Sequence, residues 1–169
     1  MALRMSEAQH KQLVKGAKKK SRNRKRPALL PPSPVALVLG ELARITVLFD
    51  LAMLGENRLQ GKPAGYIKHI KDLAGEAAYF GWLAAGKPQI DEDQWPVVMD
   101  LVVRRGRKLD QNNCWGAVKR PLDSVCCAGG ILPADSEKYL ICGEVKQETG
   151  AAWLNRPEFV MLFRKRGEA

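Results

Sequence analysis

The chain has 169 residues, of which 46% are hydrophobic and 27% charged, and its formal net charge is +10 at pH 7. This length and balance indicate a globular domain with a core of its own. We expect no membrane span, because no apolar run approaches ~20 residues. The basic N-terminus also lacks the apolar core of a signal peptide, which predicts a cytoplasmic location.

Residues 1–26 form a basic arm. They hold ten lysines and arginines against Glu7 alone, so nearly all of the net charge of +10 lies in the arm. Such a segment buries little apolar surface, so we expect it to be disordered when free and to bind nucleic-acid phosphates. A solubilising tail and a targeting signal are the alternatives. The arm's candidate DNA contacts are Lys18, Lys19, Lys20, Arg22, Arg24, Lys25 and Arg26.

The segment PALLPPSP, residues 27–34, follows the arm. Closely spaced prolines prevent regular helix and favour an extended linker. We therefore predict a basic flexible arm over residues 1–34 and an α/β domain over residues 35–169.

The remaining chain alternates strand and helix patterns. In chain order, we predict a strand over 43–54, a loop over 55–65, a helix over 66–86, a strand over 95–110, a helix over 113–128, and two strands over 137–147 and 157–166. The lone His69 is predicted on the helix surface. This order indicates a small α/β domain with a mixed sheet and two main helices.

The second predicted helix carries four further expectations. Asn113 can cap its N-terminus, and Pro121 should bend its axis, since proline removes a backbone hydrogen bond. Lys119 and Asp123, four residues apart, should share one face. The buried stripe is predicted to be Trp115, Val118, Leu122 and Val125.

Acidic and amide side chains flank this helix. In an extended segment, Asp110 and Asn112 would point to one face, and Asp135 follows a glycine turn. We expect Asp110 and Asp135 to converge near Lys119, where carboxylate and amide oxygens would suit Mg²⁺ and the lysine would stabilise a phosphate. In the alternative interpretation, Asp110 only starts a turn and Lys119 and Asp123 form a solvated surface pair.

The four cysteines fit no zinc-binding spacing. We expect Cys114, Cys126, Cys127 and Cys142 to be free and mostly buried.

A different kind of site is suggested by the basic run just before Asp110, whose charge would attract a phosphate. Its candidate DNA contacts are Arg104, Arg105, Arg107 and Lys108. A solvated loop is the alternative.

Residues 104–140 resemble the RusA family of Holliday junction resolvases, many of them encoded by phages. The segment RRGRKLDQNN supplies the family's basic run and an Asp-x-Asn-Asn motif. GAVKRPLD supplies Lys119 and Asp123, and AGGILPADS supplies the glycine turn and Asp135.

The resemblance implies a homodimer with two Mg²⁺-dependent active sites that resolves four-way DNA junctions by paired nicks. Asp110, Asn112 and Asp135 would bind the metal, Lys119 would be the catalytic lysine, and Asp123 would orient it. Two positions depart from the family: Asn112 replaces an aspartate, and Ala134 replaces the first of two acids. A neutral amide binds Mg²⁺ more weakly than a carboxylate does.

Three functions are therefore open. The first is a junction-resolving endonuclease. The second is a weakened or inactive protein of the same fold that binds branched DNA. The third is an RNA-associated basic protein in which the arm alone binds.

Overall fold

The computed structural model describes residues 40–167. The predicted arm, linker and domain boundary lie outside these residues. The elements in chain order are β1 (Glu41–Val47), η1 (Leu51–Leu54), α2 (Glu56–Leu59), α3 (Ala64–Ala84), η2 (Glu92–Gln94), β2 (Val97–Arg105), α4 (Gln111–Asp123), η3 (Ser124–Gly129), β3 (Leu140–Thr149), η4 (Ala151–Trp153) and β4 (Glu158–Arg164).

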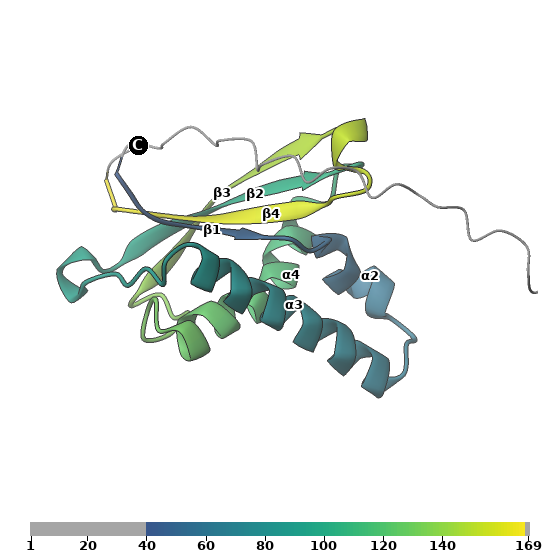
Figure 1. Cartoon of the computed structure of the whole chain (residues 1–169), viewed down its shortest axis with the longest axis horizontal. Helices are drawn as coiled ribbons and strands as arrows, with labels where there is room; N and C mark the ends of the chain where they lie inside the picture. Colours follow the sequence, from purple (N-terminus) through teal and green to yellow (C-terminus); the bar gives the residue numbers. More distant parts are fainter. Residues whose placement is uncertain (1–39, 168–169) are drawn as a thin grey trace, which may run out of the picture. The chain divides into compact units, whose positions relative to one another are not determined.

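The four strands form one mixed sheet in the order β1-β4-β2-β3. Strand β2 runs parallel to β3, whereas β4 is antiparallel to both β1 and β2. Helices α3 and α4 lie together on one side of this sheet (Figure 1). The predicted α/β class, mixed sheet and two main helices are confirmed. None of the helices over residues 40–167 is long and apolar enough to cross a membrane.

Strand β1 is shorter than predicted, because the chain turns at Asp50. The Asp50 side chain accepts a hydrogen bond from the backbone N–H of Ala52, 3.1 Å away, and caps the short helix η1. Cap residues of this kind satisfy a free amide at a helix start. The apolar run over residues 51–54 therefore packs as a helical turn instead of extending the strand. The loop predicted over 55–65 also contains one helical turn, α2.

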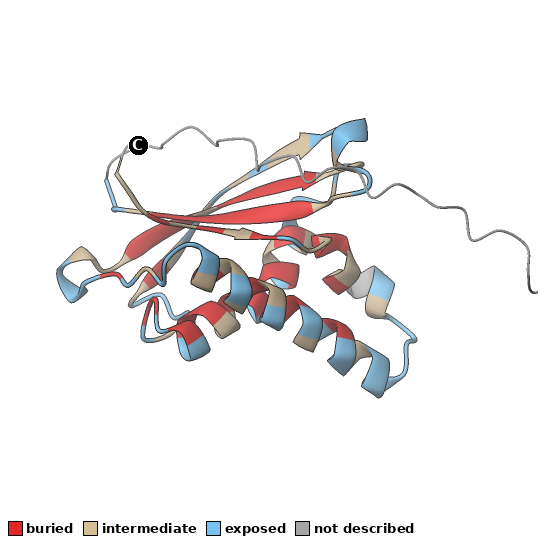
Figure 2. Cartoon of the chain, in the orientation of Figure 1, coloured by how far each residue is buried: buried red, intermediate tan, exposed pale blue. Residues whose placement is uncertain are grey.

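Strand β2 is buried on both faces (Figure 2). On the helix side, Met99, Leu101 and Val103 join the main core with residues of β1 and β4. On the opposite side, Val102 forms a smaller cluster with Val160 and Leu162. A strand whose two faces are both buried takes apolar residues at successive positions, and for this reason β2 does not alternate.

Helix α3 packs on the sheet through residues four apart, Ile70, Ala74, Ala78 and Trp82. Small residues let the helix come close, and Gly81 is the clearest case. A Cβ atom at Gly81 would collide with the backbone oxygen of Thr46 in β1. The glycine that weakens the helix pattern in the sequence is thus needed for contact with the sheet. His69 is exposed on this helix, as predicted.

Helix α4 contains Pro121 and changes its winding soon afterwards. From Ser124 to Gly129 the chain continues as a π-helix, η3, and it stops at Gly130, whose φ of 76° is left-handed. Such a conformation favours glycine, which has no Cβ to clash. The glycine turn predicted before Asp135 is confirmed, and it brings Asp135 back beside the end of α4.

A β-bulge shapes the edge strand β3 where it passes Asp100 of β2. The Asp100 carboxylate accepts a hydrogen bond from the Glu144 backbone N–H at 2.8 Å and binds Arg164 at 2.6 Å. A Cβ atom at Gly143 would overlap this carboxylate. Glycine is therefore required here to keep β3 in its register with β2.

Candidate functional site

The start of α4 is organised by Asp110. Its carboxylate accepts a hydrogen bond from the backbone N–H of Asn112 at 2.8 Å, so Asp110 is the N-cap. The expectation that Asn113 caps this helix is wrong, because Asn113 already lies within the first turn. Asn112 is also helical and exposed, so it does not share an extended segment with Asp110. The side-chain amide of Gln147 in β3 holds the backbone of the preceding residue, Leu109. The Leu109 N–H donates to the amide oxygen at 2.7 Å, and the amide nitrogen donates to the Leu109 carbonyl at 2.8 Å.

Lys119, Asp123 and Asp135 meet at the other end of α4. Lys119 Nζ lies 3.8 Å from Asp135 Oδ2, and these two side chains are 72% and 34% exposed. Asp123 is partly buried beside Asp135. The turn at Gly130 therefore brings Asp135 to Lys119, as expected, while Asp123 faces the second carboxyl group in addition to the lysine.

Two carboxyl groups in contact disfavour their charged forms. Burial first, and then the Asp135 carboxylate, raise the pKa of Asp123, and the opposing effects of Lys119 and Arg120 do not cancel this rise. A hydrogen bond with Asp135 acts in the same direction. Such a bond requires a proton on one of the two groups, since an ionised carboxylate only accepts. The pair is thus suited to hold either a proton or a cation.

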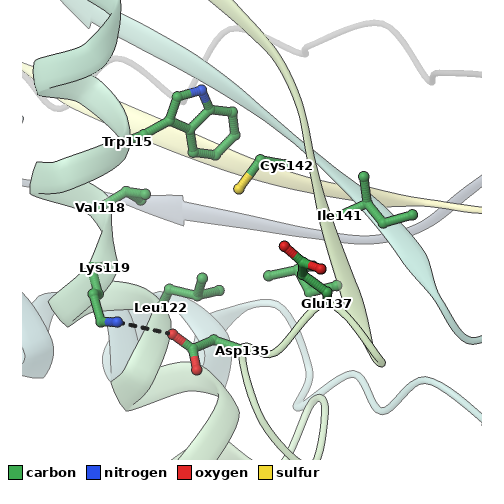
Figure 3. Close-up of a pocket in the computed structure, with 9 residues that line it drawn as sticks. Trp115, Val118, Lys119, Leu122, Asp135, Glu137, Ile141 and Cys142 are labelled. Carbon is green, nitrogen blue, oxygen red and sulfur yellow. Dashed lines mark ion pairs between the residues drawn. The ribbon is translucent and has the colours of Figure 1, made fainter.

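A pocket of about 510 Å³ opens between α4 and β3 beside this pair. Figure 3 shows Trp115 and Cys142 at one end and the Lys119–Asp135 ion pair at the other. The remaining walls are mainly apolar, and Glu137 stands near the acidic side. Trp115 was predicted to be core. It is only partly buried and forms a wall of the pocket, whereas Val118, Leu122 and Val125 are buried as expected.

Asp110 does not belong to this group. It caps the first turn of α4, and Asp123 is the last residue of the same 13-residue helix. A helix of that length spans ~20 Å, and Asp135 contacts the Asp123 end. Mg²⁺ ligands lie at about 2.1 Å from the ion, whereas Asp110 caps one end of α4 and Asp135 contacts Lys119 and Asp123 nearer its other end. The structure therefore places the predicted ligands Asp110 and Asp135 against different turns of α4. Over residues 40–167, no group of three or more histidine, cysteine or acidic side chains has an arrangement that could hold a metal.

The basic run before Asp110 divides into two parts. Arg104 is buried, with hydrogen bonds of 2.8 Å to both Glu148 and Glu158, and it lies 5.0 Å from the ring centre of Trp153. Burial opposes its charge, but the two glutamates outweigh this effect and raise the pKa of Arg104. Its guanidinium is thus committed to the fold, away from any DNA phosphate.

Arg105 is also occupied, since its Nε lies 3.2 Å from Asp50. By contrast, Arg107 and Lys108 are exposed at the end of β2. These two residues are the members of the basic run that remain accessible to a nucleic acid. The local sequence does not distinguish the exposed Arg107 and Lys108 from the buried Arg104, because both glutamate partners of Arg104 lie far along the chain.

The cysteines are free, as predicted, but only Cys114 and Cys126 are buried. Burial, and then the neighbouring Cys127 and the two aspartates nearby, raise the pKa of Cys126 to about 12. Burial and Asp135 also raise the pKa of Cys142, which lines the pocket. Thiols with raised pKa values are poor nucleophiles and poor metal ligands, because the thiolate is the reactive form.

Comparisons of the chain with protein-family models, curated proteins and solved structures found no match.

Proposed function

We propose that this chain binds branched DNA of the four-way-junction type, as a homodimer, without cutting it through Asp110. The separation of Asp110 from Asp135 along α4 is the observation that favours a binding function over a cutting function. Phosphodiester cleavage of the expected kind needs their oxygens on a common ion. Support for DNA as the ligand comes from the basic arm and from the RusA resemblance over residues 104–140.

Arg107 and Lys108 are the proposed contacts of the folded domain. They are exposed just after β2, next to the N-terminal end of α4. Each phosphate contact adds to the salt dependence of binding. The arm would supply further contacts of the same kind and most of the affinity, whereas preference for a junction over a duplex would come from the folded domain.

Fluorescence anisotropy of a labelled four-way junction and of a duplex with the same arm sequence tests this proposal. We expect the full chain to bind the junction at least ~10-fold more tightly than the duplex at moderate salt, with or without Mg²⁺. The double variant Arg107→Ala/Lys108→Ala should weaken binding and lower the slope of affinity against salt by about two. Arm-only binding, the RNA-associated alternative, would instead give equal affinities for the two DNAs.

A second candidate is a Mg²⁺-dependent endonuclease whose centre is Asp123, Asp135 and Lys119. The observation that favours it is the carboxyl pair beside the lysine at the pocket mouth. Asp123 and Asp135 would hold the ion, which would polarise a phosphate, and Lys119 would stabilise the charge that develops on that phosphate.

Aspartate variants separate the two candidates. If the carboxyl pair is a catalytic centre, the chain cuts the junction in Mg²⁺, Asp135→Asn abolishes cutting, and Asp110→Asn leaves it unchanged. If the chain only binds, none of these proteins cuts. Restoring the family residue with Asn112→Asp should not create cleavage, because residue 112 lies in the first turn of α4, far from Asp135.

A further inference from the structure

Helix α3 carries an unusual set of exposed apolar side chains. Tyr66, Leu73 and Phe80 are 41%, 40% and 64% exposed. They are three of the five large hydrophobic residues that are exposed within residues 40–167. None of them is needed for the contact between α3 and the sheet, which uses residues on another face of the helix.

These three residues recur at intervals of seven. Seven residues make nearly two turns, so the side chains form one stripe that is ~21 Å long. Ala77 and Ala84 fall along the same stripe, and their small side chains allow a second helix to approach. Apolar residues with heptad spacing are the pattern by which one helix packs along another.

We propose that this stripe, Tyr66–Leu73–Phe80, is the surface through which the α3 helices of two copies of the chain pair antiparallel. The stripe is symmetric about its middle residue. A two-fold axis at Leu73 puts Leu73 against the second copy's Leu73, and it puts Phe80 against the second copy's Tyr66. A symmetric dimer requires a self-complementary patch of this kind.

Polar residues on one flank of the stripe fit the same pairing. His69 and Glu76 are both exposed and lie on the same side of it. Along the helix axis, Glu76 is ~4.5 Å on one side of Leu73 and His69 is ~6 Å on the other. In the antiparallel pair, each Glu76 carboxylate therefore faces the second copy's His69, whose imidazole N–H can donate to it. By symmetry the Glu76–His69 pair forms twice, and it brings no two residues of like charge face to face on that flank.

The exposed area bounds the strength of the dimer. The exposed parts of the three side chains amount to roughly 300 Å² per copy, whereas a standard interface buries about 800 Å² per partner. We therefore expect a dissociation constant in the micromolar range. The pairing uses α3 alone, and it would place the second copy of the homodimer in the proposed function. A wild-type chain that dimerises and prefers the junction, but whose dimer is unaffected by Leu73→Glu, would refute only this inference.

Sedimentation equilibrium without DNA tests the pairing. The wild-type chain should be a reversible dimer with a dissociation constant below roughly 100 µM. Leu73→Glu and Phe80→Glu should each weaken it at least ~10-fold, since each places a carboxylate in an apolar contact. Lys71→Glu is the matched control, because residue 71 is exposed but points roughly 200° away around the helix. A monomeric wild type, or equal weakening by all three variants, overturns the proposal.

A symmetric disulfide tests the position of the axis. In a Cys127→Ser/Cys142→Ser background, Leu73→Cys should form a covalent dimer on mild oxidation, and Lys71→Cys should not. Melting temperatures near that of the background protein would show that the variants fold. If Leu73→Cys stays monomeric but reacts slowly with a maleimide, another occupant such as residues 1–39 covers the stripe, and the second copy does not. Equal cross-linking of both variants would show random collision, and it would also contradict the pairing.

Discussion

Replacing Arg104 with alanine should destabilise the chain strongly while leaving junction affinity unchanged. Arg104 and Glu158 are 5% and 7% exposed, and the hydrogen bond between them is 2.8 Å long. Removal of the arginine leaves the Glu158 carboxylate buried without a counterion. Loss of one partner of such a pair costs about 3–5 kcal/mol, because the remaining charge keeps its desolvation penalty.

The other contacts of Arg104 add less. Glu148 is 34% exposed, so solvent screens its attraction. Trp153 contributes about 0.5–1 kcal/mol through its ring face. We therefore expect a total loss near 4–5 kcal/mol, which lowers the melting temperature by about 10–15 °C in a domain of this size.

Urea unfolding of wild type and Arg104→Ala measures this loss, and junction anisotropy below the melting transition measures binding. The double variant Arg104→Met/Glu158→Met is the control. It should recover most of the stability, since replacing a buried ion pair with apolar side chains is often nearly neutral. A loss below ~1 kcal/mol for Arg104→Ala would refute the structural role. A large drop in junction affinity in the folded variant would show that Arg104 contacts the DNA.

Three further outcomes follow from the packing and the pKa shifts. Gly143→Ala should destabilise the chain by about 2–3 kcal/mol in urea unfolding, because the new methyl group overlaps the Asp100 carboxylate. Its control Gly116→Ala, which meets open space on α4, should stabilise by about 0.5–1 kcal/mol. The folded chain keeps a proton on Asp123 above pH 3.8, where the unfolded chain loses it, so the unfolding free energy falls as pH rises through this window. Asp123→Asn should thus gain stability over wild type at neutral pH but not well below pH 3.8. Ellman's reagent should modify Cys126 only after unfolding.

The elements that carry strong periodic patterns could be predicted from the sequence. Helix α3 follows its apolar spacing, and strand β2 follows its unbroken apolar run. The end of β1 could not be predicted in the same way. Its apolar pattern continues through residue 54, but a local cap at Asp50 turns the chain. A single side-chain hydrogen bond decides that boundary, and apolar periodicity does not detect it.

The candidate site was predictable only in part. The glycine stop at Gly130 indicates a chain reversal, so the meeting of Asp135 with Lys119 follows from the sequence. The position of Asp110 does not, because an aspartate before a helix fits both a metal ligand and an N-cap. The internal role of Arg104 was also hidden, since its glutamate partners arrive from β3 and from the start of β4.

Incubation of a labelled four-way junction with saturating full-length chain in Mg²⁺ is the most direct measurement, with native and denaturing gels run on the same sample. We predict a shifted junction on the native gel and intact strands on the denaturing gel. Symmetric nicks that disappear in Asp110→Asn would contradict the account, because they would require Asp110 to act at a cutting centre that the geometry of α4 separates from Asp135.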